Sequence, residues 1–143
     1  MDLDKIADIF SINHDGKIIK LEKKDNILEI KVEIAYLAEL RNNTDKILNY
    51  KISGCSGLKF VDICENSKIY TNIQEIEKME LTILEAKRRD NIIIIGVCSQ
   101  KCPYGELQLC ANDIIIYDQN NGEIKYSELK KMAKEYWEAR ERK

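Results

Sequence analysis

Histidine is almost missing from this chain, because His14 is its only one. A zinc site of the Cys/His type or a catalytic Cys–His pair would have to use it. His14 stands in the stretch NHDG, where Asn, Asp and Gly are common turn formers, so we expect a solvated turn residue. No G-x-S-x-G, H-E-x-x-H or P-loop pattern is present. The sequence therefore does not favour an enzyme.

Long apolar runs and an excess of one charge are also missing. The longest purely apolar run, Ile92–Ile95, falls far short of the roughly 20 residues that a membrane-spanning helix needs. The first residues are acidic and lack a long apolar stretch, so we expect no secretory signal there. The 25 acidic and 23 basic residues give a net charge of −2. Nucleic-acid-binding domains usually carry a basic excess or a basic face. We therefore expect a soluble cytoplasmic protein that binds neither nucleic acid nor membrane.

Proline and glycine are scarce, with one and six residues, and no linker rich in Pro, Gly or Ser interrupts the chain. We therefore expect residues 1–143 to form a single domain, which is an ordinary length for one hydrophobic core. The many Ile, Lys and Asn residues are typical of an AT-rich bacterial genome. Residues 3–12 carry apolar side chains at helical spacing. Two alternatives remain open for them: a short helix, or an extended segment that enters the sheet.

Two periodic patterns predict the fold class. Apolar residues alternate with polar or small ones along a half-buried antiparallel strand: Leu28, Ile30, Val32, Ile34 and Tyr36. Near the C-terminus the apolar positions form a helical stripe: Leu129, Met132, Ala133, Tyr136 and Trp137. We expect this helix to start at Ser127 as its N-cap and to lie on the sheet, anchored by Trp137. The predicted fold is α+β, a mainly antiparallel, curved or partly closed sheet with an amphipathic C-terminal helix packed on it.

Five cysteines, an odd number, cannot all be paired, and in a reducing compartment we expect free thiols. Three of them fall in the stretch GVCSQKCPYGELQLC, which we interpret as a hairpin with its loop at residues 99–105 and a type I turn through Pro103. This register places Cys98 opposite Glu106 and Ile94 opposite Cys110. Cys98 and Cys110 would then lie roughly 13 Å apart, too far for a disulfide or a shared zinc ion.

A thiol or metal site remains an alternative to a protein without chemistry at its cysteines. Cys98 and Cys102 are spaced as C-x3-C, and Cys55 with Cys64 could supply two more sulfur ligands. These spacings differ from the close C-x2-C pairs of structural zinc sites and redox centres. We therefore predict no cofactor.

The leading hypothesis is a protein-binding or regulatory domain without enzymatic activity. Tyr104 on a loop and Tyr117 near a turn belong to a residue type favoured at interfaces, although tyrosine is also an ordinary strand residue. In general build, a small near-neutral β-rich domain, the chain resembles bacterial binding proteins such as the immunity partners of toxins, which implies a protein partner.

A further alternative is a small-molecule or enzymatic cavity in the sheet. It would need carboxylates that converge on an apolar floor. Asp62, Glu65 and Asp113 are the candidates, and for each we expect surface solvation. The partner, the strand order and the oligomeric state are left open by the sequence.

Overall fold

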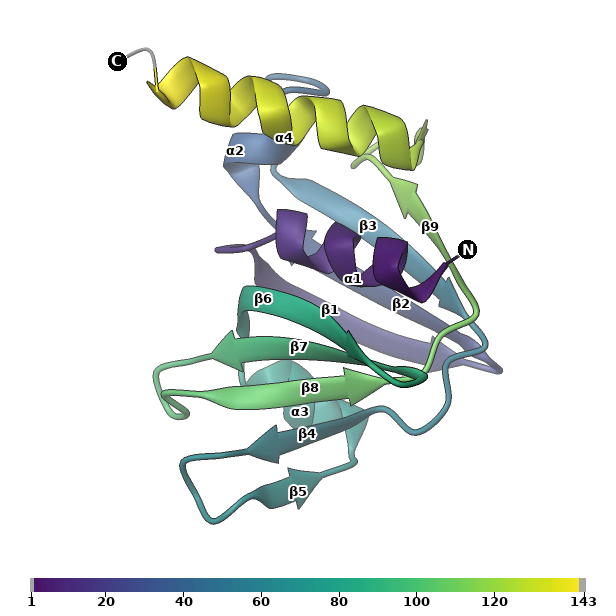
Figure 1. Ribbon diagram of the computed structural model, residues 1–143, viewed down its shortest axis with the longest axis vertical. Coiled ribbons are helices and arrows are strands. Elements are labelled where there is room, and N and C mark those ends of the chain that lie inside the picture. Colours follow the sequence, from purple (N-terminus) through teal and green to yellow (C-terminus); the bar gives the residue numbers. More distant parts are fainter. Residues whose placement is uncertain (1, 142–143) are drawn as a thin grey trace.

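The computed structural model describes residues 2–141 of the chain, and within this range it contains ten strands and four helices (Figure 1). The helices are α1 (Leu3–Ile12), α2 (Ala35–Ala38), α3 (Ile73–Lys78) and α4 (Tyr126–Glu141). The strands are β1 (Lys17–Lys24), β2 (Ile27–Glu33), β3 (Ile47–Ser53), β4 (Lys59–Asp62), β5 (Lys68–Tyr70), β6 (Thr82–Arg89), β7 (Ile92–Cys98), β8 (Gly105–Leu109), β9 (Asp113–Tyr117) and β10 (Glu123–Ile124). None of the helices in this range combines the length and apolar character that a membrane crossing demands.

All strands pair antiparallel in the order β10-β9-β3-β2-β1-β6-β7-β8-β4-β5. The β1–β6 ladder consists of a single residue pair, Lys17 with Thr82, whereas the neighbouring ladders are long. The sheet therefore bends at this junction into a first half-sheet (β10, β9, β3, β2, β1) and a second half-sheet (β6, β7, β8, β4, β5), which diverge from each other in Figure 1. The predicted class, α+β with a curved antiparallel sheet, is confirmed.

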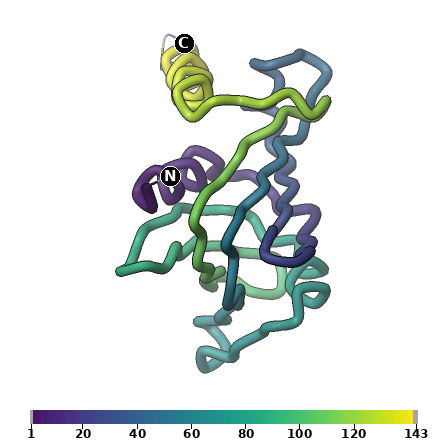
Figure 2. The backbone as a smooth tube through the Cα atoms, turned by 90° about the vertical axis from the view of Figure 1, so that its right-hand side faces the viewer, coloured from purple at the N-terminus to yellow at the C-terminus, as the bar shows by residue number. Residues whose placement is uncertain are grey.

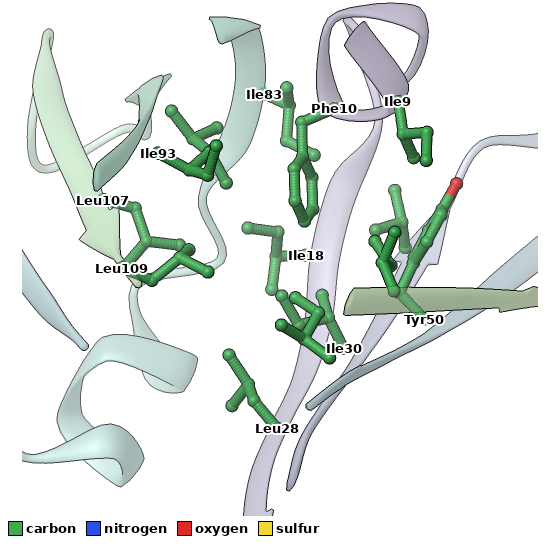
Figure 3. Close-up of a cluster of buried hydrophobic side chains, with 14 of the residues drawn as sticks. Ile9, Phe10, Ile18, Leu28, Ile30, Tyr50, Ile83, Ile93, Leu107 and Leu109 are labelled. Carbon is green, nitrogen blue, oxygen red and sulfur yellow. The ribbon is translucent and has the colours of Figure 1, made fainter. Parts of the chain in front are cut away.

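The hydrophobic core fills the space between the two half-sheets and α1. Figure 3 shows side chains from all three parts pointing toward one another: Phe10 from α1, Ile30 and Tyr50 from the first half-sheet, and Ile93 and Leu107 from the second. These five side chains are completely buried. Burial of large apolar side chains is the main contribution to the stability of such a fold.

Helix α1 resolves the alternative that the N-terminal pattern left open. It begins after Asp2, whose carboxylate accepts a hydrogen bond from the N–H of Asp4 at 2.7 Å, an N-cap interaction. Just beyond its end, Asn13 is completely buried, and its Nδ2 donates to the carbonyl of Ile9 at 2.6 Å. The side chain of Asn13 thus bonds the last turn of the helix inside the core.

Strand β2 shows the predicted alternation, with Leu28, Ile30 and Val32 completely buried, but it ends earlier than predicted. The strand stops at Glu33, Ile34 adopts φ −151° and ψ 70°, and Tyr36 lies in the short helix α2. The N–H of Ile34 still donates to the carbonyl of Lys46 at 2.8 Å, which continues the β2–β3 register by one residue, and the chain then turns into α2.

The predicted hairpin around Pro103 is formed by β7 and β8, with a register shifted by two residues. Gly96, not Cys98, lies opposite Glu106, and Ile94 lies opposite Gln108 rather than Cys110. A shift of two keeps every side chain on its predicted face, so Val97 and its apolar neighbours still face the core. In this register Gly105 belongs to β8, opposite Val97, and a Cβ there would overlap the ring of Phe60, so the position requires glycine.

Helix α4 is present where the stripe predicts it, but two details differ. Its first turn begins one residue before Ser127: the N–H of Leu129 donates to the carbonyl of Lys125, and Glu128 accepts from the N–H of Lys125 at 3.3 Å. This is the glutamate half of a capping box, so Ser127 is not the N-cap. The helix contacts α1 and α2, and Trp137 is 38% exposed instead of being buried against the sheet. Figure 2 shows α1 and α4 on the same side of β3 and β9.

Candidate functional site

The five cysteines do not form one cluster; they lie in different parts of the structure and differ in burial. Cys98 lies at the end of β7 opposite Thr82, beside a hollow of about 610 Å³ that also contains Lys17, Lys78 and Lys101. Cys102 is buried, and its thiol donates to the carbonyl of Tyr104 at 3.2 Å. The C-x3-C pair thus has one thiol on a lysine-rich hollow and one inside the protein.

Cys102 is buried next to a carboxylate. Burial and the neighbouring Asp62 raise the pKa of its thiol to about 11. The thiolate is the nucleophilic and metal-binding form, so this thiol is protonated and unreactive at neutral pH. Cys64 is exposed on the turn after β4, close enough to Cys102 to raise the pKa of the Cys102 thiol slightly further.

Cys55 is buried, and Cys110 is half-buried just after the end of β8. Burial raises the pKa of the Cys55 thiol, and the nearby Cys110 raises it further. Among residues 2–141, no group of three or more His, Cys, Asp and Glu side chains is placed to hold a metal ion. Of the four cysteines of the metal alternative, Cys55 lies between β3 and β4, Cys64 in the β4–β5 turn, Cys98 at the end of β7 and Cys102 within the β7–β8 loop.

The three candidate carboxylates do not converge. Asp62 is buried, contrary to the expected surface solvation, because its Oδ1 accepts hydrogen bonds from the N–H groups of Cys64 and Glu65 in the turn after β4. Glu65 is exposed on that turn, whereas Asp113 starts β9 in the other half-sheet.

The two candidate interface tyrosines lie in different half-sheets. Tyr104 precedes β8 and is half-buried; its hydroxyl donates to Glu85 at 3.3 Å, and burial together with Glu85 raises its pKa. Tyr117 ends β9, and the ammonium group of Lys51 lies 5.3 Å from its ring centroid. The two tyrosines do not form one surface.

A larger aromatic set gathers where α4 crosses α2 and the end of α1. We call His14, Tyr36, Tyr136, Trp137 and Arg140 the aromatic surface. The Trp137 ring stacks on His14 with centroids 5.2 Å apart, and the rings of Tyr36 and Tyr136 lie 4.5 Å apart. The guanidinium of Arg140 lies over both Tyr136 and Trp137, at 5.4 and 5.7 Å, a cation–π arrangement.

Backbone and side-chain hydrogen bonds hold the aromatic surface in place. The Tyr36 hydroxyl donates to the carbonyl of His14 at 2.7 Å, and Arg140 donates to the hydroxyl of Tyr136. Burial raises the pKa of Tyr36 to about 12. His14 is therefore a half-buried stacking partner and not the solvated turn residue that the sequence indicates.

An ionic cluster fixes the other end of α4. Arg41, just after α2, pairs with Asp118 at 3.2 Å and with Glu128 at 2.8 Å. Asp118 lies in the β9–β10 turn and accepts hydrogen bonds from the N–H groups of Asn120 and Gly122. This cluster connects α2, the turn and the first turn of α4, so it sets the position of the helix that carries Trp137.

Sequence reasoning missed the aromatic surface because its members come from three separate segments. The stripe assigned Tyr136 and Trp137 to packing, and nothing local linked them to His14 or Tyr36. One signal was available: Arg140 stands four and three residues after Tyr136 and Trp137, the helical spacing that places a cation over both rings.

Comparison with family models, with curated protein sequences and with solved structures found no match.

Proposed function

We propose that this protein binds another protein through the aromatic surface. The observation that carries the proposal is the state of Trp137, which contacts three other aromatic rings yet leaves 38% of its area exposed. Trp, Tyr and Arg are the residue types that most often dominate binding energy at protein interfaces. The general build, which resembles that of immunity partners of toxins, points to the same class of function.

The arrangement of the rings supports this proposal energetically. Each aromatic side chain is already held by a neighbour or by a hydrogen bond to the backbone. A partner would therefore not need to immobilise free side chains, which costs about 0.5–1.5 kcal/mol each at an ordinary interface. A preorganised surface of this kind favours binding.

A mostly charged groove lies beside the aromatic surface on α4. It has a volume of about 300 Å³, and its lining comprises two apolar residues, Leu40 and Met132, and four charged ones: Arg41, Glu128, Lys131 and Glu135. Leu40 is 44% exposed. Charged residues next to an aromatic centre match the polar rim that surrounds the core of an interface.

Capture from the native organism tests the proposal. Immobilised wild-type protein is expected to retain a stoichiometric partner, and Trp137→Ala and Arg140→Ala are expected to lose it. Ile69→Ala is the matched control, since Ile69 is a large exposed apolar residue on β5, far along the sheet order from α4. Circular dichroism confirms that each variant is folded. Absence of any partner, or a partner that both Trp137→Ala and Arg140→Ala retain, would contradict the proposal.

A further inference from the structure

A second hollow lies where β8 ends, in a different part of the molecule from the aromatic surface. It has a volume of about 600 Å³ and receives residues from both half-sheets and from the segment that leads into α3. We call it the β8 pocket. Its lining consists of Lys23, Gly57, Leu58, Lys59, Thr71, Ile73, Ile92, Gln108, Leu109 and Cys110. This volume lies within the range of about 300–1,000 Å³ that is usual for small-molecule sites.

The wall of the β8 pocket is aliphatic. Ile73 and Ile92 are partly exposed and offer aliphatic surface, whereas Leu58 and Leu109 behind them are buried core residues. None of the ten lining residues is aromatic. A planar ring bound here would find no stacking partner, whereas a flexible alkyl chain would bury apolar area against these side chains.

The charge at the rim of the pocket is positive and uncompensated. Lys23 on β1 and Lys59 on β4 both line it, and none of the ten lining residues is acidic. Within residues 2–141, neither lysine forms an ion pair.

Five other lysines have a carboxylate partner: Lys17, Lys20, Lys125, Lys131 and Lys134. Most of the remaining lysines in residues 2–141 have none, so the lack of an ion pair alone does not mark a site. What distinguishes Lys23 and Lys59 is that both line the same largely apolar hollow, in which no acidic residue provides a counter-charge.

We propose that the β8 pocket binds a small aliphatic carboxylate of the fatty-acid class. The alkyl chain lies against the partly exposed Ile73 and Ile92, and the carboxylate lies at the rim near the ammonium groups of Lys23 and Lys59. Hydrogen bonds between ionised partners are about twice as strong as those between neutral groups. The hydroxyl of Thr71 is a further donor at the same rim.

Calorimetric titration with three ligands of one chain length tests the head group. Decanoate and decylammonium are titrated below the concentration at which they form micelles, and decanol below its solubility limit. We expect decanoate to bind with one molecule per chain and decanol to bind about 10- to 100-fold more weakly, because it loses the charged hydrogen bonds. Decylammonium is expected to be the weakest, since its charge repels both lysines. Equal affinities for decanoate and decanol, or no binding of decanoate, would overturn the proposal.

Variants locate the site. Lys23→Gln and Lys59→Gln are each expected to weaken decanoate about 3- to 10-fold and to leave decanol unchanged. Lys24→Gln is the matched control, because Lys24 follows Lys23 on β1 but lies outside the pocket. Trp137→Ala is expected to bind decanoate like wild type, which separates this site from the aromatic surface. An affinity for decanoate that stays the same in both Lys23→Gln and Lys59→Gln would place the ligand elsewhere and refute the assignment.

Discussion

The hydroxyl of Tyr50 on β3 donates a hydrogen bond of 2.5 Å to Oδ1 of Asn13 inside the core. Both residues are completely buried, and burial raises the pKa of Tyr50, so the phenol stays protonated and can donate. Nδ2 of Asn13 is bonded in turn to the last turn of α1. One buried side-chain pair thus connects the N-terminal helix to the first half-sheet.

Replacement of Tyr50 by Phe should destabilise the protein by about 1–3 kcal/mol, because it leaves the buried Oδ1 of Asn13 without its donor. Urea unfolding monitored by circular dichroism measures the change. The control is Tyr117→Phe, which removes the same hydroxyl from a half-buried position on β9 and should cost less than about 0.5 kcal/mol. Similar losses in the two variants would show that the Asn13 contact contributes nothing specific.

Gly105→Ala should destabilise the β7–β8 hairpin, because an added Cβ would lie 2.5 Å from Cε2 of Phe60 and 2.8 Å from the carbonyl oxygen of Val61. Overpacking of this kind costs about 1–3 kcal/mol. Gly57→Ala is the comparison: its Cβ would meet no atom within 4 Å, so only its left-handed backbone, at φ +66°, adds a cost. In thermal unfolding, Gly105→Ala should lose more stability than Gly57→Ala; the reverse order would contradict the clash with Phe60.

The thiols should react at very different rates with a disulfide reagent. Cys64 is exposed and should be labelled first at pH 8, whereas Cys55 and Cys102 should react only on unfolding, since both are buried and burial raises the pKa of each thiol. Mass spectrometry of peptides from a timed labelling reaction resolves the individual sites. Rapid modification of Cys102 in the folded protein would be incompatible with its buried position next to Asp62.

The raised pKa of Cys102 also predicts a pH dependence of stability. The folded-state pKa of about 11 lies above the ordinary thiol pKa of 9.0, so the unfolded state releases its proton first as the pH rises. The stabilising contribution is therefore complete below pH 9 and is lost between about pH 9 and 11, with a size on the order of 1 kcal/mol. Urea unfolding at pH 8 and pH 10.5 should show a smaller decrease for Cys102→Ala than for wild type. Identical decreases would argue against this thiol as a source of the effect.

The contribution of Asp118 to stability should depend on pH in the opposite sense to that of Cys102. Burial opposes its ionisation, but the N–H of Gly122 and the guanidinium of Arg41 outweigh burial and lower the pKa of the carboxyl. Its contribution is then present at neutral pH and is lost as the pH falls through the folded-state pKa. Asp118→Ala should cost about 1–3 kcal/mol at pH 7 and clearly less at acidic pH, whereas Glu39→Ala, at an exposed position, should change little at either. A cost for Asp118→Ala that does not depend on pH would exclude the charge as its origin.

Elements with a strong local pattern could be predicted from the sequence. The alternation on β2, the hairpin around Pro103 and the stripe of α4 each depend on residues close together in the chain, and each is present. The two-residue shift of the hairpin escaped prediction because Gly105, which the turn signal placed in the loop, belongs to β8 and pairs with both Val97 and Asp62 of β4. The end of β2 at Glu33 escaped prediction because the apolar alternation continues to Tyr36, which lies in α2.

The binding surfaces could not be predicted, because each needs segments that only the tertiary structure brings together. The aromatic surface combines His14, Tyr36 and the end of α4. The β8 pocket combines Lys23 with residues that follow Gly57. The helical stripe indicated that Trp137 packs, and it does contact His14, Tyr36 and Tyr136, but 38% of it stays exposed.

The second half-sheet is a continuous insertion between two neighbouring strands of the first. Residues 54–112 leave at the end of β3 and return at the start of β9, where the N–H of Asn112 donates to the carbonyl of Ser53 at 2.9 Å. During synthesis, β1, β2 and β3 can assemble early, but β9 can join them only after the whole inserted stretch has been made. Ladders that close over such long sequence separations form slowly, so β3 is an unprotected sheet edge until the last quarter of the chain emerges.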